Sequence, residues 1–503
     1  MNKNILQYLE SSATKYPEKT VFASKQTSIT YIDFVNNAKK IGTVLLENGF
    51  EKNNIAVFID KSVNCLLGMF GAMYANCCYT IIDVDSPAER INTILDTLTP
   101  SCLITDSANR SVCEKYSDKQ IFVIDEMIEC KVAENLLCDC RKRHCDTDPM
   151  YVLFTSGSTG IPKGSVICHR SVIDYAETIC KTFDINKETV WGSQTPFYFS
   201  MSILDVFSNI VAGATLYIIP KICFSFPLTL IEFLNDNKIN TLYWVPTALN
   251  IVADFDTFSV GKPQWLKKVL FAGESMPIKQ LNYWKKHLPD VMYANLYGPT
   301  EITDTCTYYI VDRDFKPGDS LPIGIPFDNC DVLVIDDNKH LVLPGSDDEG
   351  VLYVRGSFLG LGYYNNPEKT EEAFVQNPLN DKYPEILYRT GDIVSYNERG
   401  ELLFKGRKDH QIKHMGHRIE LGEIENGASA IEGIERVCCL YNEEKSKIVL
   451  FYTGTVEESA VKKLIKSHVP GYMVPQKCIK LSTMPINMNG KIDRVGLSKK
   501  YFN

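Results

Sequence analysis

Short apolar runs alternate with amphipathic stretches along most of the chain, and this alternation predicts a layered α/β fold. Residues 53–60 predict a buried strand, the stretch that follows to Ala75 predicts a helix, and residues 78–85 predict a second strand. Three further candidate buried strands each end near a turn signal: 101–106, 120–126 and 151–158.

The pattern changes at about Leu321, where shorter strand-like runs separated by Gly and Pro turns begin. These runs occupy 331–337, 341–345, 350–356 and 400–407. They predict a β-rich subdomain over about 321–408, which would complete a large core over 1–408.

A domain boundary is expected near 406–409. Beyond it the pattern predicts a helix over 421–431, strands around Val437 and over 448–452, and a helix over 457–467. We therefore expect a separate α+β domain over 409–503, whose size of roughly 95 residues is enough to fold by itself.

Composition narrows the functional classes. The chain has 503 residues, so two to four domains or subdomains are expected. A net charge of −9 argues against nucleic acid as the main partner. At the N-terminus Leu6, Leu9 and Ala13 recur at helical spacing, which predicts a short amphipathic helix and not a signal peptide. No apolar run has the length of a membrane span, so we expect a cytoplasmic protein with no membrane partner.

Seventeen cysteines raise the question of disulfides or a metal site. The length and the lack of an export signal oppose disulfides. Potential metal ligands gather over 130–145, at Cys130, Cys138, Cys140, His144 and Cys145. The spacing lacks the paired C-x2-C knuckles of zinc sites, so free thiols are the expectation and a metal is the alternative.

The segment 151–170 carries the first chemistry. An apolar strand is predicted to lead into a loop of hydroxyl residues and glycines, with a lysine near its end and a helix after it. Glycine amides can approach phosphate oxygens, hydroxyls add donors and lysine adds a charge. The candidate phosphate-binding residues are Thr155, Ser156, Gly157, Ser158, Thr159, Gly160 and Lys163. The residue order differs from a Walker A loop, which opposes a P-loop kinase; a plain surface turn is the other alternative.

This loop resembles the phosphate-loop signature of the adenylate-forming superfamily, which includes acyl-CoA ligases, luciferases and the adenylation domains of non-ribosomal peptide synthesis. Four other segments resemble the family's motifs and occur in the family's order, at 295–301, 388–392, 406–425 and 489–494. Together they cover nearly the whole chain. The resemblance implies an α/β enzyme that uses ATP and Mg²⁺ to make an acyl-adenylate, with a mobile C-terminal domain.

The resemblance also assigns nucleotide contacts. Tyr297 would stack on adenine, and Asn295 would meet the purine's polar edge. Asp392 would accept from the ribose hydroxyls beside the charged Arg407. Thr300 and Glu301 are assigned to catalysis, with Glu301 as the Mg²⁺ ligand. The remaining residues assigned to the nucleotide are Gly273, Glu274, Leu296, Gly298 and Phe404.

Lys491 resembles the family's catalytic lysine, which stabilises the negative charge formed when a carboxylate attacks the α-phosphate. Loss of such a contact typically costs about 10²–10³ in rate. Asp409 resembles the hinge about which the small domain rotates, which would withdraw Lys491 and bring in a face around Gly416. A non-catalytic nucleotide-binding module is disfavoured, because Lys491, Glu301 and Asp392 are all present.

The substrate is less well defined. Residues 79–91 are most similar to the amino-acid-activating members, including D-alanine–carrier-protein ligases. Those members hold the substrate's α-ammonium with the aspartate of a Phe-Asp-x-Ser segment, and here Ser200 occupies that position. A hydroxyl cannot neutralise an ammonium ion, which argues against an ordinary α-amino acid. Ser202 and Asp205 have the spacing of a helix capping box.

The family pattern places a mostly apolar acyl pocket at Ser200, Met201, Leu204, Tyr243, Leu270, Ala272, Leu296, Asp304 and Thr305. Asp304 could bind an amine displaced from the α-position, as in a β-amino acid, or accept from the phenol of a hydroxybenzoic acid. The β-amino acid is the slightly favoured hypothesis.

The chain ends soon after the Lys491 loop, so we expect no fused carrier domain. The acyl acceptor is then expected to be a separate phosphopantetheinyl carrier protein. An acyl-CoA ligase that uses free CoA and a D-alanine–carrier-protein ligase are the alternatives.

Overall fold

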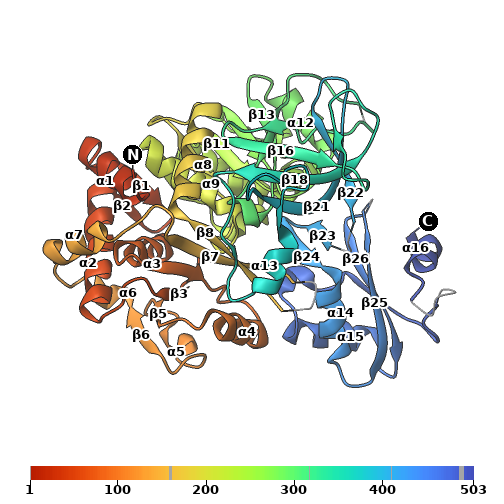
Figure 1. Cartoon of the computed structure of the whole chain (residues 1–503), viewed down its shortest axis with the longest axis horizontal. Helices are drawn as coiled ribbons and strands as arrows, with labels where there is room; N and C mark the ends of the chain where they lie inside the picture. The colour runs from red at the N-terminus through yellow and green to blue at the C-terminus, as the bar shows by residue number, and fades with distance from the viewer. Residues whose placement is uncertain are drawn as a thin grey trace. The chain divides into compact units, whose positions relative to one another are not determined.

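The computed structural model describes residues 2–157, 161–316, 318–408, 411–443, 445–486 and 492–502 (Figure 1). The chain divides into two compact units. The first comprises Met1–Val84, Leu98–Leu153 and Gly164–Lys408, and the second comprises Asp85–Thr97, Phe154–Lys163 and Asp409–Asn503. In the described part of the chain, every helix is too short or too polar to cross a lipid bilayer.

Within the described ranges the first unit contains three main sheets. The largest follows the order β15 (Ile325–Pro326), β14 (Thr307–Ile310), β13 (Met292–Tyr297), β12 (Lys268–Phe271), β11 (Thr241–Trp244), β9 (Val190–Ser193), β10 (Thr215–Ile218), β1 (Thr20–Ala23) and β2 (Ser28–Thr30). The second follows the order β19 (Gly362–Tyr363), β8 (Lys163–Cys168), β7 (Pro149–Thr155), β4 (Cys78–Ile81), β3 (Asn54–Phe58), β5 (Cys102–Thr105) and β6 (Gln120–Val123). Its strands β7 and β8 flank the phosphate-loop segment.

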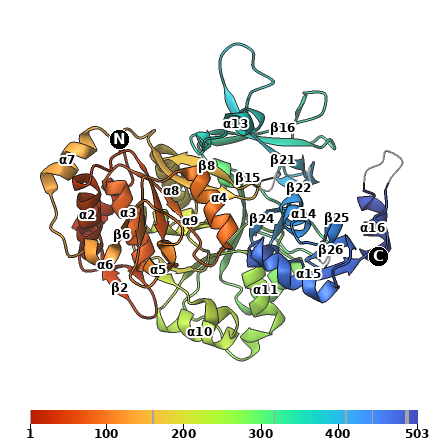
Figure 2. The same ribbon diagram turned by 90° about the horizontal axis from the view of Figure 1, so that it is seen from below.

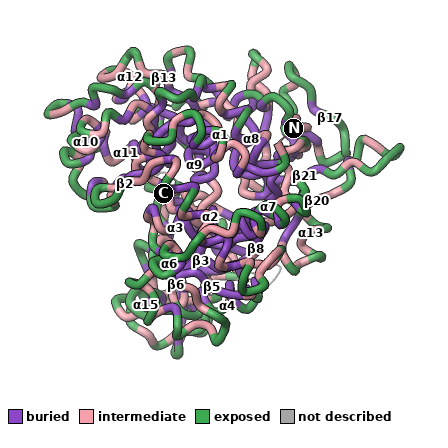
Figure 3. Tube along the Cα trace, turned by 90° about the vertical axis from the view of Figure 1, so that its left-hand side faces the viewer, coloured by how far each residue is buried: buried purple, intermediate pink, exposed green. Residues whose placement is uncertain are grey.

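Helices pack between these two sheets. α3 (Val63–Tyr74) contacts β3 and β4, whereas α9 (Met201–Ala212) contacts β9, β10 and β11. The rings of Phe70 on α3 and Phe207 on α9 lie 5.8 Å apart, so the two helices meet face to face. This position explains why both are apolar on nearly all sides. Figure 3 shows α9 mainly in the colour of buried residues, while α10 (Pro227–Asp236) and α12 (Ile278–His287) carry exposed ones.

Two further helices cover these layers. α2 (Tyr31–Glu47) packs along α3, and α8 (His169–Thr182) packs along α9 (Figures 1 and 2). The N-terminal helix α1 (Leu6–Lys15) contacts α2 and α9, and buries Leu6, Leu9 and Ala13 as their spacing predicts. The layered α/β fold predicted from the sequence is confirmed.

The third sheet has the order β17 (Leu341–Val342), β16 (Cys330–Ile335), β18 (Gly350–Gly356), β21 (Ile386–Tyr396) and β20 (Phe374–Gln376), with β22 (Leu402–Arg407) paired to β21. Each predicted run between 331 and 407 is a strand of this sheet. Its pairs are antiparallel, which suits the short Gly- and Pro-bounded runs of the sequence.

The second unit has its own core. It contains the hairpin β23 (Gln411–His414) and β24 (His417–Glu420), the helix α14 (Leu421–Ser429), the sheet β25 (Ile434–Asn442), β26 (Lys447–Gly454) and β27 (Lys477–Lys480), and the helices α15 (Glu458–Leu464) and α16 (Arg494–Phe502). The predicted helices and strands of this region are present. Most of α4 (Ala88–Leu98) also belongs to this unit.

Candidate active site

The parallel strands of the large sheet bring most of the predicted acyl-site residues to one edge. β9, β11, β12 and β13 are parallel, so their carboxyl ends lie together. Tyr243 is near the end of β11, Leu270 near the end of β12, and Leu296 near the end of β13. In open α/β sheets this edge is where ligands bind. Ser200, Met201 and Leu204 come from the start of α9, which follows β9.

Asp304 is a buried carboxylate at this edge, with 2% of its surface exposed. Its Oδ2 accepts hydrogen bonds from the hydroxyls of Tyr175 and Tyr243, each at 2.9 Å. The Ser200 side chain also faces Asp304. Burial raises the pKa of Asp304 to about 7, and these hydroxyl donors oppose the shift.

Asp304 forms no ion pair with a described Lys, Arg or His side chain. Its hydrogen-bond donors are neutral hydroxyls, which orient the carboxylate without cancelling its charge. Thr305 contacts the same cluster, because its hydroxyl lies 2.7 Å from that of Tyr175. The site therefore holds a buried carboxyl group whose ionised form a cationic ligand group would stabilise.

A strained turn positions Asp304. Thr303 has φ of +77°, an unusual conformation for a β-branched residue, and follows the short 3₁₀ turn η3 (Thr300–Ile302). Its hydroxyl donates to the carbonyl of Phe358 over 2.8 Å, which holds the turn. A Cβ on Gly298 would lie 2.5 Å from the Asp304 carbonyl, so only glycine permits this close approach.

Glu301 lies in η3 and is completely buried. The hydroxyl of Tyr363 donates to its Oε1 over 2.6 Å, and the amide of Gly360 donates to its carbonyl over 2.8 Å. Carboxylate oxygens keep further acceptor capacity beside one such bond. The described residues contain no group of three or more His, Cys, Asp or Glu arranged for a metal. A single carboxylate fits Mg²⁺, which usually takes its other ligands from phosphates and water.

Tyr297, predicted for the adenine, and Asp392 and Arg407, predicted for the ribose, come together. The Tyr297 hydroxyl donates to Asp392 Oδ2, and Arg407 Nη1 donates to Asp392 Oδ1. Asp392 is on β21 and Arg407 at the end of β22, which pair in register. Burial, followed by the Asp392 charge, raises the pKa of Tyr297 well above its ordinary value, so it remains a donor.

The other predicted residues of the first unit have the following partners and positions. Asn295 is buried and its amide donates to the Pro322 carbonyl over 2.8 Å. Glu274 accepts from the amide and hydroxyl of Thr247, at 2.9 and 2.7 Å. Gly273 has φ of +91°, which favours glycine. Three more predicted residues have these positions: Phe404 lies on β22, Ala272 follows β12, and Thr300 opens η3 with its hydroxyl 3.2 Å from that of Ser200.

The phosphate-loop segment differs from the prediction in one respect. After the loop the chain forms strand β8, and the helix α8 begins only at His169, so the expectation of a helix directly after the loop was wrong. The consecutive apolar residues Val166, Ile167 and Cys168 favour a strand, because a strand covered on both faces carries a continuous apolar run. Thr155 and Lys163 end and begin the flanking strands, while Ser158, Thr159, Gly160, Asp409 and Lys491 lie outside the described residues.

Two close contacts to backbone carbonyl groups constrain this segment within the second unit. A Cβ on Gly157 would lie 2.0 Å from the Ile161 carbonyl oxygen, so glycine is required there. The hydroxyl of Ser156 donates to the Arg418 carbonyl over 2.5 Å.

The predicted capping box at Ser202 and Asp205 was wrong. α9 begins at Met201, with Ser200 at the N-cap and no side-chain cap. Ser202 is inside the helix and its hydroxyl donates to the Phe199 carbonyl over 2.7 Å. Asp205 is buried in the next turn, with 1% exposed.

Local sequence patterns assigned no role to Tyr175 or Lys61 and placed Asp205 in a helix cap. Tyr175 lies on α8, 129 positions from Asp304, and no local motif connects them. Lys61 follows β3 in a turn whose polar residues are typical of a surface. The lysine next to a buried strand and the aspartate inside an apolar helix were the signals available, because ionisable groups are rarely buried without a partner.

The cysteine cluster has mixed burial: Cys140 is buried, whereas Cys130, Cys138 and Cys145 are exposed. All described cysteines are free thiols.

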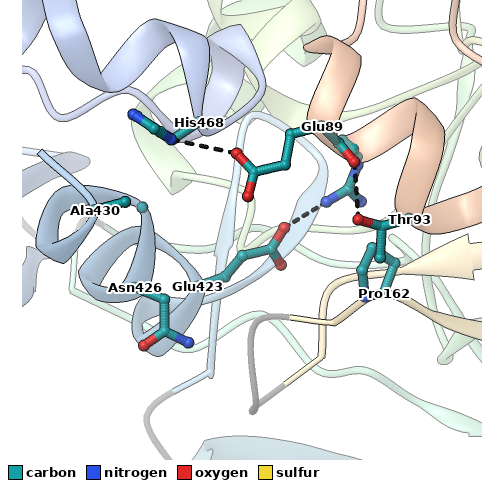
Figure 4. Close-up of a pocket in the computed structure, with 9 residues that line it drawn as sticks. Glu89, Thr93, Pro162, Glu423, Asn426, Ala430 and His468 are labelled. Atoms are coloured by element: carbon teal, nitrogen blue, oxygen red, sulfur yellow. Dashed lines mark hydrogen bonds and ion pairs between the residues drawn. The ribbon is translucent and has the colours of Figure 1, made fainter.

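A small polar cavity of about 130 Å³ lies within the second unit (Figure 4). Its lining comes from α4, α14 and their surroundings: Glu89, Arg90, Thr93, Pro162, Glu423, Asn426, Gly427, Ala430 and His468. Arg90 pairs with Glu423, both mostly buried, and His468 Nδ1 lies 3.2 Å from Glu89 Oε2. Except for Pro162, which is within the loop segment, the lining is separate from the predicted site residues.

Comparisons with known proteins identify the family of the chain. A family model described as AMP-binding enzyme matches residues 9–364. Bacitracin synthase 1 of Bacillus licheniformis is 31% identical over 502 residues, 99% of this chain and 9% of that protein. The L-proline–[L-prolyl-carrier protein] ligase of Streptomyces coelicolor is 30% identical over 502 residues, 93% of this chain and 92% of that protein.

Similarity also extends to solved structures. The Vibrio cholerae adenylation domain AlmE, solved with glycyl-adenosine-5′-phosphate, has the same fold at a TM-score of 0.84 and 21% identity, with 99% of this chain and 98% of that chain covered. The chain spans only 9% to 45% of the length of several curated relatives. The family resemblance predicted from the sequence is confirmed: the chain belongs to the AMP-binding enzyme family.

Proposed function

We propose that the chain uses ATP to convert a small carboxylic acid into its acyl-adenylate, releases pyrophosphate, and transfers the acyl group to the phosphopantetheine thiol of a carrier protein. The observation that carries the proposal is the meeting of Tyr297, Asp392 and Arg407, because it groups the side chains predicted for the nucleoside in a family of AMP-binding enzymes.

In the proposed adenylation step, one bond forms at the α-phosphorus and one bond breaks there. A carboxylate oxygen of the acid attacks the α-phosphorus, the bond from the α-phosphorus to the bridging oxygen breaks, and pyrophosphate leaves. Lys491 is proposed to stabilise the charge that accumulates on the phosphate oxygens. Mg²⁺ held by Glu301 would neutralise phosphate charge. Asp392 and Arg407 would orient the nucleoside.

The acid is proposed to carry a cationic or hydrogen-bond-donating group at its far end. Asp304 supports this, because its buried charge faces hydroxyls and no cation among the described residues. Ser200 stands at the start of α9 and is neutral, which disfavours an α-ammonium there. A β-amino acid places its amine one carbon farther from the carboxylate and is the favoured substrate. A hydroxybenzoic acid, whose phenol would donate to Asp304, is the second candidate.

The acceptor is proposed to be a separate carrier protein. The similarity to a proline–carrier protein ligase, nearly all of whose length this chain covers, supports that acceptor. A ligase that uses free CoA or one specific for D-alanine remains the alternative within the same family.

Substrate-dependent ATP–pyrophosphate exchange tests the activity. A panel of α-amino, β-amino and hydroxybenzoic acids should give the highest exchange with a β-amino acid, and Lys491→Ala should lose about 10²–10³ of the rate. Exchange only with common α-amino acids would contradict the substrate proposal, and formation of ADP would contradict adenylation. Transfer of labelled acyl groups to a holo-carrier protein or to CoA identifies the acceptor.

A further inference from the structure

Tyr175 contacts the predicted acyl site from a helix outside the predicted lining. It lies on α8, is fully buried, and its hydroxyl donates to Asp304 Oδ2 over 2.9 Å. Its ring packs edge to face with the ring of Phe358, with the centroids 5.3 Å apart and the planes at 90°. This ring contact restricts where the hydroxyl can lie, so Tyr175 is a fixed donor to the carboxylate.

The number of hydroxyl hydrogens sets the direction of each bond around Tyr175. An ionised carboxylate only accepts, and a tyrosine or threonine hydroxyl has one hydrogen to donate. Tyr175 donates its hydrogen to Asp304, and the Thr305 hydroxyl oxygen lies 2.7 Å from the Tyr175 oxygen. Thr305 must therefore donate to Tyr175, and a hydroxyl that accepts such a bond becomes a stronger donor itself. Thr305 is 1% exposed, and its hydroxyl has no hydrogen left for a ligand.

The two tyrosines leave one oxygen of the Asp304 carboxylate for a ligand. Tyr175 and Tyr243 both donate to Oδ2, where they occupy the two lone pairs of that oxygen. In the described part of the chain no hydrogen bond ends at Oδ1, and the neutral side chain of Ser200 faces the carboxyl group. A further hydrogen-bond donor, such as the amine of a bound acid, would therefore bind at Oδ1.

We propose that Tyr175 is a positioning residue that sets substrate specificity: together with Tyr243 it holds Asp304 so that Oδ1 meets the amine of the bound acid. Thr305 acts through Tyr175, supports the carboxylate and does not itself contact the acid. The proposal rests on the proposed function, since it names the residues that orient Asp304 toward the amine of the substrate. Substrate preference then depends on a residue of α8, behind the predicted lining.

The ionisable side chains around Asp304 determine which pH changes are expected. Four of them face it from the elements packed against it: Tyr175 on α8, Tyr243 on β11, Tyr151 on β7 and Asp205 on α9. Burial raises the pKa of each tyrosine well above its ordinary value, so all three stay protonated near neutral pH. Burial raises the pKa of Asp304 to about 7 and that of Asp205 to about 6. Asp205 is unchanged in every variant below, so its contribution cancels in the comparison.

Tyr175→Phe keeps the ring and removes the donor. In pyrophosphate exchange with a β-amino acid, kcat/KM should be about 10-fold lower near pH 7, because the ionised Asp304 loses a hydrogen bond. With an acid of the same shape that lacks the amine, kcat/KM should stay nearly unchanged. The rise of kcat/KM with pH should move to higher pH, since the lost donor favoured the ionised carboxylate.

Three further variants separate this role from a loss of packing. Thr305→Val should lower kcat/KM for the amine-bearing acid by a smaller factor than Tyr175→Phe, and Thr305→Ser, which keeps the hydroxyl, should lose less than Thr305→Val. The matched control is Tyr293→Phe, which removes a buried hydroxyl that donates to the Leu288 carbonyl over 3.1 Å, near the amino end of β13. It should leave the preference for the amine and the pH profile unchanged. Equal losses in Tyr175→Phe with and without the amine, at an unmoved pH profile, would show a purely structural role and overturn the proposal.

A measurement without turnover separates this proposal from the proposed function. Carboxyl ¹³C titration of the unliganded chain, with Asp304 assigned from Asp304→Asn, should show Asp304 titrating at higher pH in Tyr175→Phe than in the original chain. This shift in a chain that catalyses no exchange would support the role of Tyr175 and contradict adenylation. Exchange with an unshifted titration would support adenylation and overturn the role of Tyr175. If Tyr175→Phe does not fold, the direction of the same shift in Thr305→Val decides.

Discussion

The hydroxyl of Tyr243 donates a 2.9 Å hydrogen bond to the carboxylate of Asp304, although the two residues are 61 positions apart. Tyr243 lies at the carboxyl end of β11. Asp304 follows β13 and the turn η3 in the chain, directly after Thr303, whose positive φ reverses the direction of the backbone. The bond stabilises the ionised carboxylate, which burial would otherwise destabilise.

Tyr243→Phe should therefore make Asp304 harder to ionise. The expected result is a kcat/KM for the acid about 10-fold lower near pH 7, since one hydrogen bond to a charged group contributes about 1.5 kcal/mol or more. The KM for ATP should stay unchanged. Tyr217→Phe on β10, away from this edge, is the matched control and should behave like the original chain. An altered ATP KM with normal acid kinetics would contradict this assignment.

Asp304→Asn should abolish the pH dependence near 7, because an amide has no such titration. With an amino acid substrate, kcat/KM should fall by about 10² or more, as expected when a buried charge partner is removed. Acids of the same shape that lack the amine should lose much less. Steady-state exchange kinetics with an amine-bearing acid and its methyl analogue measure this difference. Equal losses with both would show that Asp304 does not contact the amine.

Tyr363→Phe should weaken the Mg²⁺ dependence of exchange. Its hydroxyl orients Glu301, and loss of such a partner typically costs about 10-fold in metal affinity. The Mg²⁺ concentration for half-maximal exchange should rise, while saturating Mg²⁺ restores most of the rate. Tyr364→Phe, which loses a bond to Asn54, is the neighbouring control. A rate loss that excess Mg²⁺ does not relieve would point to a different role.

Arg90→Met should destabilise the second unit. Glu423 would remain buried with its charge unpaired, which typically costs about 3–5 kcal/mol. Thermal and urea unfolding monitor the loss. Adding Glu423→Gln to this variant should recover a large part of it, since the unpaired charge is then gone. If Arg90→Met and the double variant have the same free energy of unfolding, the unpaired charge of Glu423 is not the cause of the loss.

His169 should make the protein less stable in acid. Burial, with a smaller contribution from His144, depresses the pKa of His169 well below its ordinary value of 6.5, so the folded chain keeps it neutral. Below a pH of about 6.5 the unfolded chain binds a proton at His169 that the folded chain does not bind. The free energy of unfolding therefore falls as the pH decreases toward the pKa of the folded state. Urea unfolding at successive pH values should show this slope. His169→Gln should reduce it, whereas His340→Gln at an exposed site should not.

The local pattern of the sequence predicted most of the elements. Apolar runs such as 53–60 and 78–81 form strands because a strand buried on both faces leaves few polar positions. The phosphate loop, the segment around Tyr297 and the segment around Asp392 were recognisable because each needs several specific residues in a short stretch. Two local predictions were wrong, each at a place where the same residues suit two structures. The segment after the phosphate loop forms the strand β8 and not a helix, and Ser202 lies inside α9 and does not cap it.

The sequence by itself determined the family, many of the helices and strands, and the groups proposed to bind the nucleotide, because those depend on short-range patterns. Only the tertiary structure decided that the hydroxyls of Tyr175 and Tyr243 bind Asp304, and that the ammonium of Lys61 reaches the carbonyl of Ser193. These contacts join residues from separate strands and helices, and the energy of a buried charge depends on what surrounds it in space. No local pattern carries that information.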